Sequence, residues 1–319
     1  MYILSLGHVE RFKSERPIII VHGGAGAWDV DEDTRRRITD FIEKLLVESY
    51  ELLMKGSEAV DVVEYAVSKL EDSGIFNAGY GSSLNIKGVA EMDAGIMIGS
   101  VMKAGAVAMS RYVKNPIKLA RIVMEKTDHV LIGGEGADEL AKLFGLEKRE
   151  INESIYRRYK DALNKKILPP YYRKNLEIID RVISLGDTVG AVALDIYGTL
   201  ASATSTGGIW FKLPGRIGDS PIPGAGFYAD RNVACSATGV GETIMTISLC
   251  RSIALSYRYL NDLYKATVES FRELEELFGG NTAGAIILSS LGEIIMYYNT
   301  KGMARGFMSS SLSKPYVNI

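Results

Sequence analysis

Hydrophobic residues near the start of the chain form first a continuous run and then a helical pattern. Residues 17–21 (PIIIV) are apolar and β-branched and lead into the glycine-rich segment HGGAG, so we expect a buried strand that enters a tight loop. Residues 34–55 carry apolar side chains at helical spacing and end at a glycine. Ser57 fits the N-cap of a second helix that runs through residue 70. The pattern predicts one strand followed by two helices.

The middle of the chain predicts a hairpin and two helices before its composition changes. Residues 91–109 contain two small, apolar runs joined near Gly99, which indicates two short strands. Helices are expected at residues 116–126, where a proline suits the first turn, and at 136–144. Residues 148–187 are rich in lysine and arginine, and we interpret them as a linker with some helix that runs over the solvated surface.

Short apolar strands recur in pairs after the linker. Residues 188–194 and 200–206 predict a hairpin of two buried strands, and residues 283–288 and 293–300 repeat that layout. Hairpins flanked by helix pairs favour an antiparallel sheet core covered by helices over alternating βαβ units, so the expected fold class is α+β. The remaining expected elements are a strand at 233–237 and helices at 242–256 and 261–277.

Composition narrows the kinds of partner. The 319 residues are 47% apolar and 24% charged with a net charge of −2, which gives no electrostatic reason to expect nucleic acid or an anionic membrane as a partner. No apolar run approaches the roughly 18 residues of a membrane span, and the N-terminus lacks the pattern of a signal peptide. Two cysteines suit a reducing compartment. We therefore expect a cytoplasmic protein whose partners are small molecules or copies of itself.

Common catalytic motifs do not occur in the sequence. The three histidines have no zinc-ligand spacing, and no phosphate-binding loop or GxSxG elbow is present. His22 is expected to shape the wall of a site and not to transfer protons. Glu91 and Asp93 fall on one side of a strand, and we interpret them as structural.

A threonine at the start of a strand offers a different chemistry. Thr188 begins the run TVGAVALD, directly after Asp187 and the linker. If the chain were cut between these two residues, the new α-amine, with a pKa of about 7.7 to 8.0, could act as base for the threonine hydroxyl. Spacing alone favours an ordinary threonine in a strand. The assignment of Thr188 as a nucleophile therefore depends on the surrounding sequence.

Several further motifs match one family in chain order. With TVGAVALD and the returning TSTGG, they resemble the plant-type asparaginases and isoaspartyl peptidases, which are N-terminal-nucleophile hydrolases activated by autoproteolysis. The resemblance covers residues 17 to 309 apart from the linker. The motifs are HGGAG (22–26), FNAGYGSSLN (76–85), EMDA (91–94), KAGAV (103–107), NPIKLARIVMEKT (115–127), PGRIGDSPIPGAGFYAD (214–230), ATGVGE (237–242) and YNTKGMARG (298–306).

The resemblance implies an architecture and an activity. The fold would be a four-layer αββα sandwich with antiparallel sheets, formed by residues 1–319 as one domain that cleaves itself into 1–187 and 188–319. The activity would be hydrolysis of L-asparagine to L-aspartate and ammonia, of β-aspartyl dipeptides, or of both. Relatives assemble as (αβ)2 homodimers. No cofactor would be required, although a structural sodium ion would be held by backbone carbonyls between Leu70 and Asn77.

The resemblance also assigns roles near the nucleophile and the substrate. Thr188 would be the nucleophile and Thr206 a hydroxyl that orients it, while Asn77 would pack against the nucleophile strand and assist processing or positioning. Arg216 would hold the substrate α-carboxylate and Asp219 its α-ammonium, a pairing that suits a zwitterion. Without the surrounding motif, these two residues could equally form a surface ion pair in a loop.

The ATGVGE motif implies an oxyanion hole. Thr238 would contribute its hydroxyl and Gly239 its N–H, and Gly241 would line the substrate pocket. The order strand, TGVG, helix also places N–H groups at a helix start, where developing negative charge is stabilised. A plain strand-to-helix turn and a phosphate loop are the alternatives, and the second is weakened because no lysine follows.

Two features leave alternatives open. Asp187 stands before the nucleophile where plant-type asparaginases commonly have glycine, as in glycosylasparaginases and threonine aspartases. Asp219 argues against a threonine aspartase, so a glycosylasparaginase-like amidohydrolase is one alternative. The other is an uncleaved, non-enzymatic protein that binds aspartate-like ligands. The sequence does not rank asparagine against β-aspartyl dipeptides.

Overall fold

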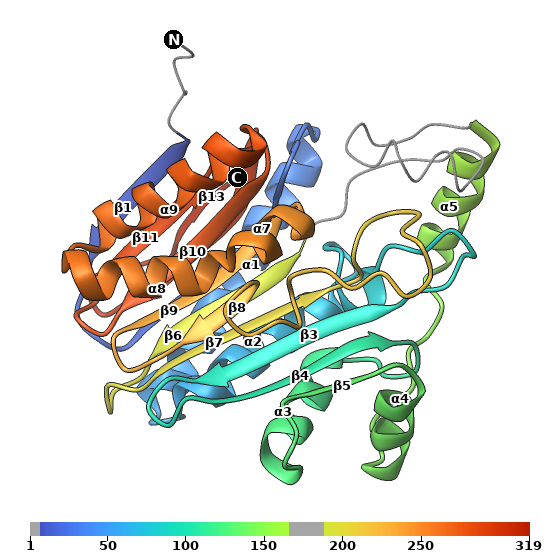
Figure 1. Cartoon of the computed structure of the whole chain (residues 1–319), viewed down its shortest axis with the longest axis horizontal. Coiled ribbons are helices and arrows are strands. Elements are labelled where there is room, and N and C mark those ends of the chain that lie inside the picture. The colour runs from blue at the N-terminus through green and yellow to red at the C-terminus, as the bar shows by residue number, and fades with distance from the viewer. Residues whose placement is uncertain (1–6, 166–187) are drawn as a thin grey trace.

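Two β-sheets form the centre of the molecule (Figure 1). The computed structural model describes residues 7–165 and 188–319. The smaller sheet has the order β1-β11-β10-β9-β8 and the larger β13-β12-β2-β6-β7-β3-β4-β5. The smaller sheet contains β1 (His8–Lys13), β8 (Phe227–Ala229), β9 (Val233–Gly239), β10 (Ala283–Ser289) and β11 (Glu293–Tyr298). The larger contains β2 (Ile18–Gly26), β3 (Met92–Ile98), β4 (Lys103–Ser110), β5 (Leu131–Gly133), β6 (Val189–Leu194), β7 (Leu200–Thr206), β12 (Gly302–Ser309) and β13 (Tyr316–Asn318).

The sheets pack against each other through β9, which contacts β6 and β7. Every residue of β6 and of β7 is buried, because the other sheet covers one face and helix α2 the other. This two-sided burial explains why both strands read as continuous runs of small and apolar residues. The predicted hairpin, with its turn at residues 195–198, is therefore confirmed.

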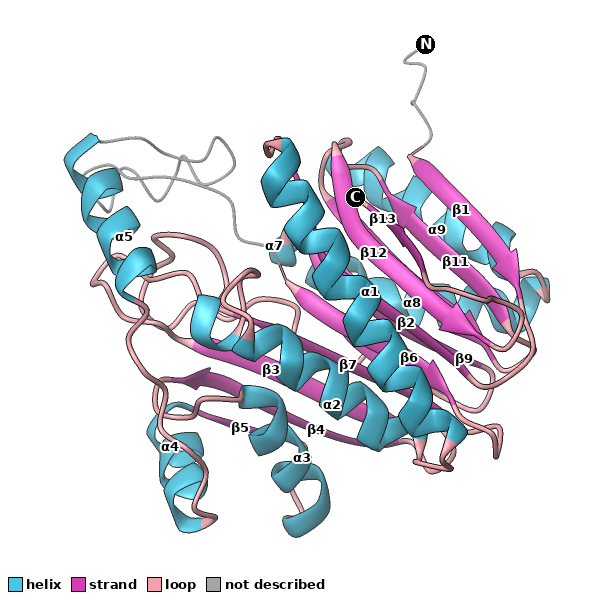
Figure 2. Ribbon diagram, turned by 180° about the vertical axis from the view of Figure 1, so that it is seen from behind, coloured by secondary structure: helices cyan, strands magenta, loops and turns pink. Residues whose placement is uncertain are grey.

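Helices cover the outer faces of both sheets (Figure 2). The mixed α/β architecture agrees with the predicted class, except that β4 and β5 pair in parallel and make the larger sheet mixed. No helix in the described stretches is long and apolar enough to cross a bilayer. On the larger sheet lie α1 (Glu32–Met54), α2 (Ala59–Asp72), α3 (Pro116–Lys126) and α4 (Gly134–Leu143); α8 (Leu249–Leu260) and α9 (Leu263–Phe278) lie on the smaller. The short elements η1 (Gly79–Gly81) and α7 (Gly241–Ile247) adjoin the loops of the site, and α5 (Glu153–Lys165) follows α4.

The N-termini of α1 and α2 differ from the predictions because other residues than expected cap them. Helix α1 starts two residues before the predicted start, because the Asp31 side chain accepts from Thr34 N at 2.7 Å. Ser57 does not cap α2. Instead, the first N–H of α2, from Ala59, donates to Asp195 Oδ2 at 3.0 Å, from the turn between β6 and β7.

The single helix predicted at residues 242–256 is wrong. The chain forms α7 and α8 separately, and Ser248 between them has the left-handed φ of 51°. A serine in this conformation ends one helix and changes the direction of the next, although no glycine or proline marks the position. The predicted helix at 261–277 is confirmed as α9, which Asp262 caps through Lys265 N at 3.0 Å.

Part of the predicted linker packs against the core. In α5, Tyr159 is 8% exposed, its ring lies 5.4 Å from that of Phe211, and its hydroxyl donates to Ile86 O at 3.0 Å. This helix is therefore a packed element and not only a solvated excursion. Asp187 and the rest of the predicted linker beyond residue 165 lie outside the described residues.

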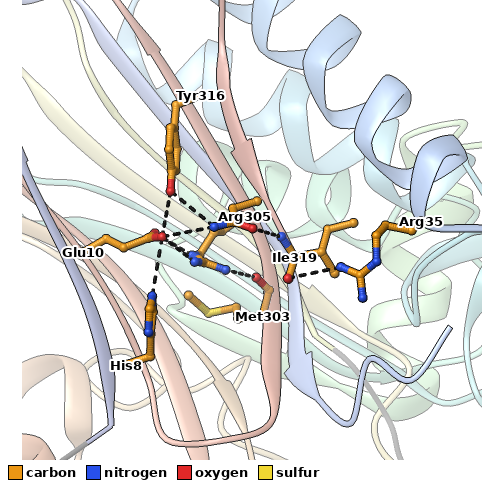
Figure 3. A network of polar contacts seen from close by, with 8 residues as sticks. His8, Glu10, Arg35, Met303, Arg305, Tyr316 and Ile319 are labelled. Atoms are coloured by element: carbon orange, nitrogen blue, oxygen red, sulfur yellow. Dashed lines mark hydrogen bonds and ion pairs between the residues drawn. The ribbon is translucent and has the colours of Figure 1, made fainter. Parts of the chain in front are cut away.

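A buried ion pair ties the edges of the two sheets together (Figure 3). Arg305 on β12 is 1% exposed in its side chain and donates to both carboxylate oxygens of Glu10 on β1, at 2.7 and 2.5 Å. Tyr316 on β13 donates to the same carboxylate at 2.7 Å. Burial alone would raise the pKa of Glu10, but the hydrogen bonds from Arg305 and Tyr316 lower it below its usual value.

Candidate active site

Two threonine hydroxyls meet at one end of the central hairpin. Thr188 immediately precedes β6, is 5% exposed, and donates through Oγ1 to Thr206 Oγ1 at 3.3 Å. Thr206 is the last residue of β7, and the antiparallel register that pairs Val189 with Ser205 brings the two strand ends together. The structure therefore brings the predicted nucleophile and its predicted hydroxyl neighbour into contact.

Asn77 fastens the loop that follows Thr206. Its Nδ2 donates to Gly208 O at 2.5 Å, its backbone oxygen accepts from Gly207 N at 3.0 Å, and Gly208 N donates to Thr206 Oγ1 at 3.0 Å. Asn77 Oδ1 also accepts from Ser83 N at 2.6 Å. Asn77 therefore holds the loop that begins directly after Thr206, the neighbour of the predicted nucleophile.

Arg216, Asp219 and Gly241 converge as predicted. A Cβ placed on Gly241 would lie 2.8 Å from Arg216 Nη2 and 2.9 Å from Asp219 Oδ1, so a larger residue there would have to displace one of these side chains. Asp219 is 3% exposed, which excludes a surface ion pair as its environment. Burial raises the pKa of Asp219 to about 7, while the charge of Arg216 opposes that shift. The site therefore holds a cation beside a carboxylate whose pKa is raised to about 7.

Two charged residues of this region were missed by the sequence reasoning. Glu242 accepts from Arg216 Nε and Nη2 at 3.0 and 2.9 Å. Lys212 is 1% exposed and donates through Nζ to Glu91 O at 2.6 Å. Burial lowers the pKa of Lys212, and the charge of Asp93 opposes that shift. Glu242 lies inside the matched ATGVGE motif and Lys212 lies two residues before the motif that begins at Pro214, but only the fold shows what each residue contacts.

Glu91 and Asp93 have the structural contacts that were expected. Glu91 pairs with Arg111 at 2.5 Å and accepts from Gly215 N at 3.2 Å, which ties down the loop that carries Arg216. Asp93 is buried and accepts from Met109 N at 2.8 Å. Burial raises the pKa of Asp93 despite the nearby charge of Lys212.

The predicted oxyanion residues lie on the facing sheet. Thr238 is buried near the end of β9, and its Oγ1 accepts from Ala25 N in the HGGAG segment at 3.1 Å. Gly239 has a φ of 136°, which favours glycine. The expectation of unused N–H groups at the helix start is wrong for Val240, whose N–H donates to Thr282 O at 2.7 Å. The hydroxyl of Thr238 and the N–H of Gly239 remain the predicted donors.

His22 is a wall residue of this region. Its Nε2 lies 2.9 Å from Ser236 Oγ on the facing sheet, which in turn lies 2.7 Å from Thr204 Oγ1 on the sheet of His22. Desolvation lowers the pKa of His22 to about 3, although contact with the backbone of Thr188 opposes the shift. A neutral imidazole at this depth agrees with a packing role.

The described residues contain no cluster of three or more His, Cys, Asp or Glu side chains that could hold a metal ion. Between Leu70 and Asn77, the predicted sodium ligands are backbone carbonyls. Leu70 O accepts from Ser73 Oγ at 2.7 Å and Phe76 O accepts from Ala78 N at 2.9 Å. A carbonyl oxygen keeps a second lone pair, so these bonds are compatible with a hard cation.

A buried hydroxyl pair, and a cation beside a carboxylate, on sheets covered by helices fit the hydrolase that the sequence motifs predict. Comparison with known proteins agrees. A family model described as asparaginase matches residues 15–317. The chain therefore belongs to the asparaginase family, and the resemblance found in the sequence is confirmed.

Three relatives illustrate the similarity. The chain is 44% identical over 292 residues to the plant-type L-asparaginase of Pyrobaculum calidifontis, covering 91% of this chain and 96% of the relative. It is 40% identical over 306 residues to the plant-type L-asparaginase of Pyrococcus furiosus, covering 94% and 99%. It is 46% identical over 235 residues to the isoaspartyl peptidase/L-asparaginase of Mus musculus, covering 73% and 70%.

Proposed function

We propose that this protein is an autoproteolytically activated amidohydrolase that converts L-asparagine to L-aspartate and ammonia and also hydrolyses β-aspartyl dipeptides. One observation carries the proposal: in a chain of the asparaginase family, Thr188 Oγ1 donates to Thr206 Oγ1 at the head of the central strand. The relatives named plant-type L-asparaginase and isoaspartyl peptidase/L-asparaginase support both substrates.

The proposed reaction begins with cleavage of the Asp187–Thr188 bond, which releases the α-amine of Thr188. The amine takes the hydroxyl proton as Oγ1 attacks the side-chain amide carbon of the substrate. The Thr238 hydroxyl and the Gly239 N–H stabilise the oxyanion, and Oγ1 gains an ester bond as the C–N bond breaks. The proton passes to the leaving nitrogen, which departs as ammonia or as an amino acid.

Water then hydrolyses the ester on Thr188 and releases aspartate. Throughout, Arg216 holds the α-carboxylate and Asp219 the α-ammonium, so the aspartyl half is fixed in the same way for both substrates. Thr206 orients the nucleophile, which its contact with Thr188 supports. Neither step requires a cofactor.

The proposal also covers the architecture, the assembly and an ion site. The fold would be a four-layer αββα sandwich of one domain, consistent with helices on the outer faces of both sheets. The cleaved chain would form an (αβ)2 homodimer in the cytoplasm, where two free, buried cysteines suit a reducing compartment. A structural sodium ion would bind the carbonyls between Leu70 and Asn77.

Cleavage and turnover test the proposal together. Denaturing mass analysis of the purified protein should give chains of residues 1–187 and 188–319. Thr188→Ala should remain one chain and release no ammonia from asparagine, because both steps need the same hydroxyl. Thr246→Ala, which changes an exposed threonine of α7, should mature and turn over normally. Asparaginase activity in Thr188→Ala would remove Thr188 from its role.

A panel of ligands separates the alternatives. A glycosylasparaginase-like enzyme would release sugar from a glycosylated asparagine faster than ammonia from asparagine. A non-enzymatic binder would stay uncleaved and be stabilised by aspartate without releasing ammonia.

A further inference from the structure

Two carboxylates, Asp219 and Glu242, lie beside the Arg216 guanidinium. Glu242 accepts two hydrogen bonds from Arg216, at 3.0 and 2.9 Å, in a bidentate pair. Asp219 lies beside the same guanidinium, since a Cβ on Gly241 would approach both Arg216 Nη2 and Asp219 Oδ1 within 2.9 Å. Arg216 therefore already has a carboxylate partner from the protein before the substrate α-carboxylate arrives.

Glu242 also acts on Asp219 through space. The pKa of Asp219 is raised to about 7 first by burial and is lowered by Arg216, while the charges of Glu242 and Asp93 raise it further. With Glu242 and Asp219 ionised, these two carboxylates and Arg216 carry one net negative charge, and the nearby Lys212 and Asp93 add one charge of each sign when both are ionised. A ligand that brings its own cation relieves this excess, whereas a purely anionic ligand increases it.

We propose that Glu242 is a specificity-determining residue that rejects dicarboxylates lacking an α-ammonium group. The inference rests on the proposed function, which places the aspartyl half of the substrate at Arg216 and Asp219. Because Glu242 already neutralises much of the charge of Arg216, a ligand carboxylate gains little net attraction there by itself. An ammonium group paired with Asp219 supplies the missing attraction.

L-Aspartate and succinate are the matched ligands for this idea. They share a four-carbon skeleton and two carboxylates, and differ only in the α-ammonium group. Succinate would bring the same two carboxylates to the site but would leave the Asp219 carboxylate without a cation. Glu242 thereby keeps unaminated four-carbon acids from blocking a site that must bind an aspartyl group.

The test is the ratio of the two dissociation constants, measured by calorimetry on matured enzyme. In Glu242→Gln, we expect the succinate-to-aspartate ratio to fall about three- to tenfold, a modest effect because solvent screens the charge; the Glu242 side chain is 40% exposed. Glu242→Asp keeps the charge and should keep the ratio. Glu273→Gln removes an exposed charge from α9 and should leave the ratio unchanged.

The alternative outcomes are distinct. If Glu242→Gln weakens both ligands by one common factor, Glu242 only orients Arg216 and the proposal is wrong. An unchanged or increased ratio overturns it as well. If matured wild-type protein binds no aspartate, the assignment of the pocket fails and the inference fails with it. If aspartate binds and is discriminated equally well without Glu242, only the inference fails.

Discussion

Replacement of Gly190 by alanine tests how tightly the central strand packs against the facing sheet. Gly190 lies two residues after Thr188 on β6, in the middle of the larger sheet. A Cβ at this position would overlap Ser236 Oγ and His22 Nε2 and would lie 3.0 Å from Ala203 O. His22 and Ser236 are both fully buried and hydrogen-bonded to each other, so neither can move into solvent.

The cost of the substitution follows from the two ways to relieve this overlap. Rotating Ser236 away breaks the buried bond to His22 and leaves unsatisfied polar groups, at about 1–3 kcal/mol. Shifting β6 costs about 1–3 kcal/mol for overpacking. Alanine restricts the unfolded chain and returns about 0.4–1 kcal/mol. The overlap requires part of the Ser236 rotation and part of the β6 shift. After the gain from alanine is subtracted, we expect Gly190→Ala to lower the free energy of unfolding by about 2–4 kcal/mol.

Urea denaturation of uncleaved protein measures this loss. Both the substitution and its reference should be made in the Thr188→Ala background, which keeps the protein one chain and the unfolding reaction unimolecular. The control is Gly280→Ala, where an added Cβ has nothing within 4 Å. Gly190→Ala should lower the denaturation midpoint without changing the slope, whereas Gly280→Ala should not. Equal stability of the two variants would refute the packing argument.

Two further predictions concern charged groups. Because protonated Asp219 cannot pair with an ammonium group and its pKa is about 7, the inhibition constant of L-aspartate should rise roughly tenfold from pH 8 to pH 6. That of succinate should change much less, and equal changes would contradict the assignment of Asp219. Arg305→Met should cost about 3–5 kcal/mol in thermal or urea unfolding because it removes the buried guanidinium that neutralises the Glu10 carboxylate. Arg11→Met breaks a pair whose arginine is 54% exposed and should cost less than about 1 kcal/mol; similar losses would refute this reasoning.

The sequence predicted elements whose pattern is local and strong. The strands β6 and β7 are continuous apolar runs separated by a turn, and burial on both faces is what such runs require. Helix α3 begins at its proline as expected. The break between α7 and α8 was missed because Ser248 adopts a left-handed conformation although no glycine, asparagine or proline marks the position.

The candidate site was predictable only through the family motifs. The hydrophobic periodicity alone predicts only that Thr188 is an ordinary strand residue. No local sequence pattern relates Thr188 to Arg216 or to Thr238 on the other sheet. Glu242 and Lys212 were missed for the same reason: each contacts residues distant in the chain, and such contacts leave no periodic signal. Only the three-dimensional structure shows these contacts.

The order of strands in the larger sheet affects how the matured protein would refold. β6 and β7, which follow the proposed cleavage site, lie between β2 and β3, which precede it. In the smaller sheet, β1 likewise pairs with β11 across the same division. Once the Asp187–Thr188 bond is cut, the two fragments can come apart only by separating paired strands. Recovery from denaturant would then be second order in the two fragments and depend on concentration, whereas refolding of the uncut Thr188→Ala chain would be first order.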